Sequence, residues 1–277
     1  MNVGARIARE AELAMILDWA RIEGWNPGLD DAPPFWAADP RGYFLAEVDG
    51  QPAAAISVVN HDDTFAFLGL YLCQPSFRGR GIAYGLWQHA LAHAGNRTLG
   101  LDGVPAQQDN YRKSGFVSAG STLRMQGDVP GLQDAAVRPA VAADTSRITE
   151  LDRSASGYDR KAFLVAWIAP GARRRTLVLH EGGEVAGYAT VRLCHAGIKI
   201  GPVVAPDADA AMRLIRAAAG VLGSPAAMID VPAQNQALRD RLSAVGLVPS
   251  FPTARMYRGT PPRQDGTLQA VGTLELG

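Results

Sequence analysis

The chain of 277 residues has only two cysteines, Cys73 and Cys194, and they lie in different halves. Two cysteines so far apart exclude a disulfide framework and are too few for a thiolate zinc site. The histidines show no spacing typical of metal ligands. The sequence therefore predicts a protein without a metal centre.

The chain also lacks an excess of charge of either sign, since Lys plus Arg and Asp plus Glu each total 27. Without a basic excess, neither a nucleic-acid partner nor an anionic membrane partner is predicted. The first ten residues contain no apolar core of signal-peptide length, and no apolar run reaches about 18 residues. We therefore expect a soluble, cytoplasmic protein.

What the chain does contain is an alternation of strand and helix patterns that runs through it twice. Its length suits two modules, since domains commonly span roughly 100 to 200 residues. The first half predicts strands and helices by their periodicity of apolar residues and by their turn residues. These are strand 3–9, helix 10–23, a hairpin of 43–47 and 51–59, strand 64–73, helix 81–94, strand 98–102, helix 107–113 and strand 116–125. Residues 24–36 read as a continuous loop, because Gly, Pro and Asn recur there.

The strand 64–73 leads into a short basic loop that contains Gly79 and Gly81, and a helix follows. Glycine has no Cβ, so backbone N–H groups can approach a ligand closely where the free donors of the helix begin. Arg78 and Arg80 add positive charge at the same place. This arrangement predicts a site for an anionic phosphate group.

Two motifs resemble those of the GNAT superfamily of acetyl-CoA-dependent N-acetyltransferases. Arg78-x-x-Gly81-x-Ala83 resembles its phosphate loop, and Asn110-Tyr111-Arg112-Lys113-Ser114-Gly115-Phe116 resembles its second motif, a helix with a tyrosine five residues before the phenylalanine. Both occur in the family's order and spacing. The resemblance implies an α/β (α+β) fold with a mixed sheet, in which the first half transfers acetyl from acetyl-CoA to a primary amine of a small molecule or peptide.

The resemblance also implies roles for individual residues. Backbone groups of the strand end and the phosphate loop would bind the cofactor, namely Leu72, Cys73, Arg78, Gly79, Arg80, Gly81, Ile82 and Ala83. Tyr111 would protonate the leaving sulfur as general acid, or else would only pack between helix and sheet. Cys73 on its apolar strand reads as a small packing residue rather than a covalent nucleophile. The general base stays open among water, Glu23, Asp30 and Asp102.

Two loops could contribute to the acceptor pocket. In the first, Trp25 and Asn26 lie in a polar turn, where the indole either caps the core or covers the acceptor. In the second half, Tyr158 precedes Asp159-Arg160 at the start of a predicted helix. Asp159 either caps that helix, or the loop faces the first module and helps to close the pocket.

The second half repeats the first, since Gly115, Val117, Arg124 and Met125 recur at one constant spacing as Gly246, Val248, Arg255 and Met256. At that spacing the phosphate loop falls on residues 207–212, where Asp207 and Asp209 would repel a pyrophosphate and Ala210 and Met212 replace smaller residues. We therefore expect a catalytic module at residues 1–130, a degenerate copy at 138–259 and an extended tail at 260–277. A homodimer is compatible with this reading. The alternative function is a non-catalytic acyl-CoA-binding regulatory or interaction protein.

Overall fold

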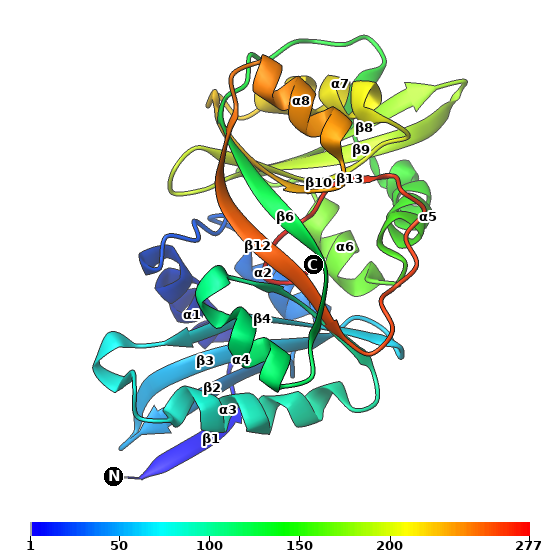
Figure 1. The fold of residues 1–277 in the computed structure, drawn as a ribbon. Coiled ribbons are helices and arrows are strands. Elements are labelled where there is room, and N and C mark those ends of the chain that lie inside the picture. Colours follow the sequence, from blue (N-terminus) through cyan, green and yellow to red (C-terminus); the bar gives the residue numbers. More distant parts are fainter. Residues whose placement is uncertain (1) are drawn as a thin grey trace.

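The computed structural model describes residues 2–277, and their strands form one continuous mixed sheet (Figure 1). The first half supplies β1 (Val3–Ile7), α1 (Glu10–Ile22), α2 (Ala32–Ala38), β2 (Tyr43–Val48), β3 (Gln51–Asn60), β4 (Phe65–Cys73), α3 (Ile82–Leu91), β5 (Thr98–Gly103), α4 (Gln108–Lys113) and β6 (Val117–Asp128). Every strand and helix predicted there is present, with ends shifted by a few residues.

The second half follows the predicted repetition as well. It supplies β7 (Val137–Pro139), α5 (Thr145–Ser156), α6 (Lys161–Ile168), β8 (Arg174–Glu181), β9 (Glu184–Leu193), β10 (Ile198–Val204), α7 (Ala208–Ala219), β11 (Ala226–Pro232), α8 (Gln236–Ala244), β12 (Val248–Arg258) and β13 (Leu268–Ala270). The mixed α/β architecture expected from the sequence is confirmed.

The prediction that residues 24–36 form one continuous loop is wrong, because its last part is the helix α2. Two prolines occupy the first turn of this helix, where a missing N–H breaks no intrahelical bond. Phe35 is fully buried and stacks on Trp167 of α6 at 6.2 Å between ring centres. Packing against the other half therefore stabilises this helix, and its two prolines are the reason that the sequence pattern indicates a loop.

The two halves exchange their last strands. β12 lies between β5 and β6, so the order through the centre of the sheet is β4-β5-β12-β6-β11-β10. β12 is antiparallel to β5, with Met256 opposite Leu101, and β6 is antiparallel to β11, with Met125 opposite Ile229. Figure 1 shows β6 and β12 running side by side between the two lobes.

The hydrophobic cores confirm this exchange. Ala254 and Met256 of β12 pack in the core formed by β2 to β5, α3 and α4, whereas Met125 and Val129 pack in the core under α7 and α8. Each core therefore contains the last strand of the other half. Because of this, neither half can complete its sheet alone.

The segment after β12 turns back into the molecule. β13 is antiparallel to β10, and the Val271 N–H donates to the Asp230 carbonyl on β11 at 2.9 Å. Leu276 is fully buried in the core that contains Leu13 and Phe35. Residues 268–277 thus run along the contact between the two lobes.

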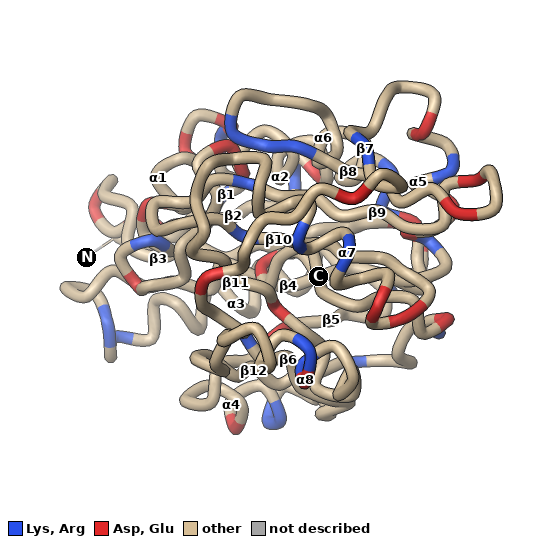
Figure 2. The backbone as a smooth tube through the Cα atoms, turned by 90° about the horizontal axis from the view of Figure 1, so that it is seen from above, with Lys and Arg blue, Asp and Glu red and all other residues tan. Residues whose placement is uncertain are grey.

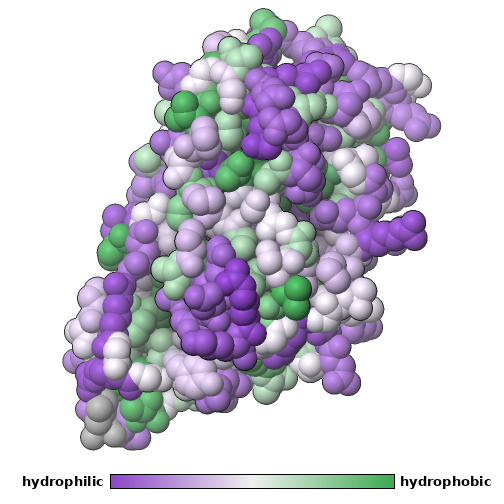
Figure 3. All heavy atoms as spheres, in the orientation of Figure 1, coloured by the Kyte–Doolittle hydropathy of each residue, from purple (hydrophilic) through white to green (hydrophobic). Residues whose placement is uncertain are grey.

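Residues of both charge signs are distributed along the whole chain, as the coloured backbone in Figure 2 shows. Polar residues cover most of the face drawn in Figure 3, with apolar ones scattered among them. In residues 2–277 no helix has the length and apolar character needed to cross a bilayer.

Candidate active site

The site begins where β4 and β5 separate. The two strands are parallel partners from Phe65 opposite Thr98 to Leu68 opposite Leu101, and the pairing ends there. Beyond that point β4 has an irregular register with β3, and Leu70 adopts a positive φ of 47°. The edge of β4 that faces β5 is therefore left without a strand partner, and its backbone polar groups line an opening in the sheet.

A groove with about 1220 Å³ of empty space, part of it open to solvent, runs from this opening to the start of α3. The predicted cofactor-binding residues that line it are Leu72, Cys73, Arg78, Gly79, Gly81, Ile82 and Ala83. Gly79 and Gly81 have φ angles of 73° and 77°, and a Cβ on either would meet no atom within 4 Å. The open side of this turn and the unpaired N–H groups of the first turn of α3 fit a phosphate group.

The two arginines of the loop are held differently. Arg78 donates from Nε to the Cys73 carbonyl at 2.9 Å and pairs with Glu23 from the end of α1. The guanidinium of Arg80 lies 5.5 Å from the centre of the ring of Phe77. Phe77 is the residue of this pair that lines the groove. Burial raises the pKa of the Cys73 thiol, which keeps it protonated and fits a packing role.

A second, deeper cavity adjoins the groove and has about 610 Å³ of empty space, part of it open to solvent. It shares Trp25, Tyr71, Val104 and Gln107 with the groove. Its walls come from both halves, because Phe251 and Thr253 of β12 and Arg124 of β6 line it together with Leu68–Tyr71 of β4. The exchange of strands therefore builds this cavity.

Tyr111 of α4 lines the deeper cavity and is 7 % exposed. Its ring stacks on Trp87 at 5.4 Å and lies against Gly103, where a Cβ would come within 2.9 Å of the ring. Burial, with a smaller contribution from Tyr71, raises the pKa of the Tyr111 hydroxyl well above its usual value. The hydroxyl is therefore protonated at neutral pH.

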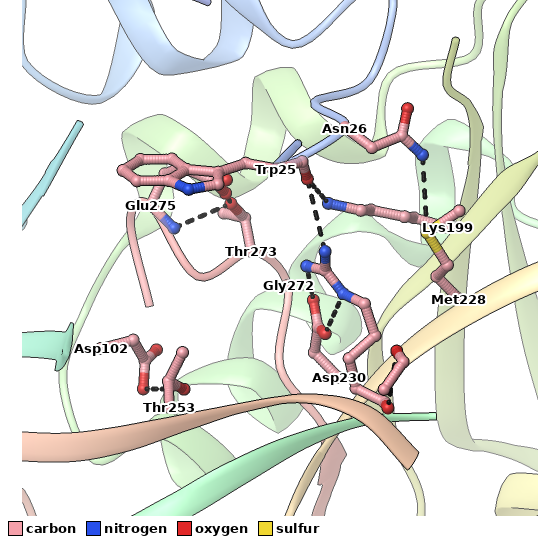
Figure 4. A network of polar contacts seen from close by, with 12 residues as sticks. Trp25, Asn26, Asp102, Lys199, Met228, Asp230, Thr253, Gly272, Thr273 and Glu275 are labelled. Carbon is pink, nitrogen blue, oxygen red and sulfur yellow. Dashed lines mark hydrogen bonds and ion pairs between the residues drawn. The ribbon is translucent and has the colours of Figure 1, made fainter. Parts of the chain in front are cut away.

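The three predicted acceptor-binding residues lie in different surroundings. Trp25 lies at the junction of groove and cavity, and its carbonyl accepts hydrogen bonds from Lys199 at 2.9 Å and Arg124 at 3.4 Å (Figure 4). Asn26 lines neither of them, and its side-chain amide exchanges hydrogen bonds with the backbone of Ala196. Tyr158 does contact the first half but is buried on Phe65, 4.0 Å between ring centres, and lines neither space.

The candidate bases are also separated. Glu23 lies at the groove with Arg78, and Asp30 pairs with Arg173 on the surface. Asp102 alone lines the deeper cavity, where it accepts two hydrogen bonds from Arg255, at 3.0 and 2.7 Å.

The Asp102–Arg255 pair has a counterpart in Arg124 and Asp230, which are joined by hydrogen bonds of 2.8 and 2.9 Å. Burial is the largest influence on both carboxyls and acts to raise the pKa of each. At Asp102 this effect is larger than the opposing effect of Arg255, so the pKa is raised. At Asp230 the opposing effects, led by Arg124 and Lys199, are larger together, so the pKa is lowered. The sequence repeat identified the two arginines as equivalent. The structure adds that each binds an aspartate of the other half.

Glu275 is a cavity residue that the sequence did not indicate, since it lies in the segment expected to be an extended tail. It is 4 % exposed, and Figure 4 shows it beside Thr273 and near the Trp25 indole. A Cβ on Gly69 of β4 would lie 2.0 Å from the Glu275 carbonyl oxygen, so the tail lies directly on the strand. Gly69 within an apolar strand was the one available signal, because such a glycine often marks a close backbone approach.

Comparison with known proteins agrees with this geometry. Residues 11–116 match the acetyltransferase (GNAT) family, and residues 148–269 match an acetyltransferase (GNAT) domain. The holothin acyltransferase of Pseudoalteromonas sp. (strain SANK 73390) is 34 % identical over 270 residues, which cover 96 % of this chain and 92 % of that protein. The chain belongs to the GNAT family. It is thus an acyltransferase of a family that uses acyl-CoA donors, with two GNAT modules in tandem.

Solved structures show the same fold. A protein from Pyrococcus horikoshii superposes with a TM-score of 0.84 at 20 % identity, covering 99 % of this chain and 96 % of that one. A tandem GNAT protein from the clavulanic acid biosynthesis pathway superposes with a TM-score of 0.65 at 16 % identity, covering 94 % and 99 %. At these identities the likeness concerns the fold alone. In the described residues, 2–277, no three His, Cys, Asp or Glu side chains form a group that could hold a metal ion.

Proposed function

We propose that the first module, residues 1–130 completed by the exchanged strand β12, carries an N-acetyltransferase activity that moves acetyl from acetyl-CoA to a primary amine of a small molecule or peptide. The observation that carries the proposal is the continuity of groove and cavity. The groove ends at the glycine loop of α3, and the adjoining cavity contains Tyr111 and the free edge of β4.

The donor would lie along the groove, with its pyrophosphate at Gly79 to Ala83 and its thioester at Leu72 and Cys73. Backbone donors at this edge would stabilise the carbonyl oxygen as it gains charge. Tyr111 would give its proton to the departing sulfur. The amine would enter the deeper cavity past Trp25, and transfer would be direct.

We further propose that the second module is degenerate and does not bind acyl-CoA. The Asp207 side chain caps α7 by accepting from the N–H groups of Asp209 and Ala210, at 2.9 and 2.8 Å. A phosphate would need those same donors. In addition, β13 is paired with Val203 and Val204, the residues that correspond to Leu72 and Cys73 in the repeat. The tail therefore lies where a second thioester would have to bind.

Titration calorimetry with acetyl-CoA tests both proposals. We expect one molecule of acetyl-CoA per chain. Gly81→Val should abolish binding, because its positive φ disfavours a β-branched residue and the new side chain would point into the groove. The matched variant Gly182→Val, in the exposed turn before β9 with a φ of 60°, should bind normally if it folds. Unchanged affinity of Gly81→Val, or two molecules bound per chain, would refute the respective assignment.

The rival function, a regulatory protein that binds acyl-CoA without turnover, predicts the same binding. Release of CoA thiol in the presence of primary amines separates the two, since only an enzyme shows release that depends on Tyr111. We favour the enzyme because Tyr111 lies on the wall of the cavity that adjoins the groove.

A further inference from the structure

Two carboxylates line the deeper cavity, Asp102 and Glu275. Both oxygens of Asp102 are engaged by Arg255, and Thr253 adds a contact at 3.4 Å. Asp102 is therefore held in a structural ion pair with the exchanged strand, and an acceptor amine would have to compete with Arg255 for its oxygens. Glu275 differs, because its hydrogen bond to a side chain involves only Oε2, through the Thr273 hydroxyl.

Thr273 fixes the direction of Glu275. Its hydroxyl accepts a hydrogen bond from the Glu275 N–H at 3.1 Å and donates one to the Glu275 carboxylate. Thr273 is fully buried, and both residues come from the segment that lies on β4 at Gly69. Glu275 is therefore held at the wall of the cavity, with its backbone on β4 at Gly69 and its carboxylate fixed by Thr273.

Two cations lie near Glu275. Arg124 and Lys199 are close enough for Glu275 to raise the pKa of each cation, although burial lowers both. A carboxylate beside a place for an ammonium group is the arrangement that proton removal needs.

Resting on the function proposed above, we propose that Glu275 is the general base of the reaction, supplied by the tail rather than by the sheet of the first module. The acceptor ammonium gives one proton to Glu275, and its freed lone pair forms the bond to the thioester carbon. The carbon–sulfur bond then breaks. The thiolate gains a proton from Tyr111, which recovers one from the nitrogen of the new amide, and Glu275 releases its proton to water.

Two acceptors of different charge test this role. 2-Phenylethylamine is an ammonium ion at neutral pH, whereas hydroxylamine already has an uncharged amino group. For Glu275→Gln we expect kcat/KM with 2-phenylethylamine to fall on the order of 10²-fold, the scale of general-base catalysis, while the rate with hydroxylamine changes by less than about threefold. Thiol release, corrected for the uncatalysed reaction, measures both.

The controls separate the possible failures. Glu184→Gln, at the exposed start of β9, should change neither rate, and calorimetry with acetyl-CoA verifies that each variant retains the donor site. An equal loss with both acceptors would show that Glu275 acts only through packing, and an unchanged rate with 2-phenylethylamine would show that it is not the base. Either result overturns the inference while the proposed function survives. If the unmodified protein transfers acetyl to neither acceptor, the proposed function fails, and the inference fails with it.

Discussion

Removing the guanidinium that binds Asp102 should destabilise the protein strongly. Arg255→Met leaves a side chain of similar length on β12 but takes both hydrogen bonds from the carboxylate. The Asp102 side chain is 0 % exposed and that of Arg255 is 13 % exposed, so the carboxylate would lose its main partner in a largely buried place. Because this pair joins β5 to the exchanged strand, the loss acts on the whole sheet.

Breaking a buried ion pair by deleting one partner costs about 3 to 5 kcal/mol of the free energy of unfolding. Replacing both partners by apolar residues, as in Asp102→Leu with Arg255→Met, removes the uncompensated charge and should recover most of that loss. By contrast, Arg112→Met removes a surface pair with Asp109, 52 % and 85 % exposed, and should cost no more than about 1 kcal/mol.

The loss should also depend on pH. Burial already raises the pKa of Asp102, and without Arg255 nothing comparable opposes it. At pH values above the ordinary aspartate pKa of about 3.9, the folded state of Arg255→Met then binds more protons than its unfolded state. The free energy of unfolding of this variant therefore falls as pH rises from about 3.9 to the raised pKa of Asp102. We therefore expect the destabilisation to be larger at pH 8 than at pH 5.

Urea unfolding followed by circular dichroism measures these differences for the four members of the cycle and for Arg112→Met. The reasoning would be refuted if Arg255→Met cost no more than Arg112→Met. It would also be refuted if the double variant were as unstable as the sum of the two single variants, since the pair would then have no coupling.

Two further predictions concern Tyr111 and His61. Tyr111→Phe keeps the ring on Trp87 but removes the acidic proton. We therefore expect kcat to fall on the order of 10²-fold, while the affinity for acetyl-CoA measured by calorimetry stays unchanged. An unaltered kcat would show that the tyrosine has only a packing role. Burial lowers the pKa of His61 to about 4, and its Nε2 is 2.8 Å from the Leu276 carbonyl. The unfolded state binds the proton of this histidine more readily, so the free energy of unfolding should decline as pH falls from about 6.5 towards about 4. In urea unfolding, His61→Gln should flatten this decline. His195→Gln, at an exposed position, should leave it unchanged.

Local features of the site followed from the sequence. The glycine loop needs residues that tolerate positive φ next to a helix start, and Gly79 and Gly81 satisfy that need within a few residues of each other. The position of Tyr111 relative to Phe116 and the order of strands and helices are likewise set by short-range patterns. The acidic residues at 207 and 209 already indicated that the second copy differs, and the structure shows Asp207 engaged as a helix cap.

The pairing of the strands was decided only in three dimensions. β6 and β12 have the same repeated sequence pattern. Either strand has the periodicity needed to pair with β5, and no local feature of the sequence indicates which one does. The choice depends on contacts far apart in the chain, such as Arg255 with Asp102 and Arg124 with Asp230. The same long-range packing buries Tyr158 away from the cavity and brings Glu275 to its wall, because a segment without its own periodicity takes its place from the surfaces it covers.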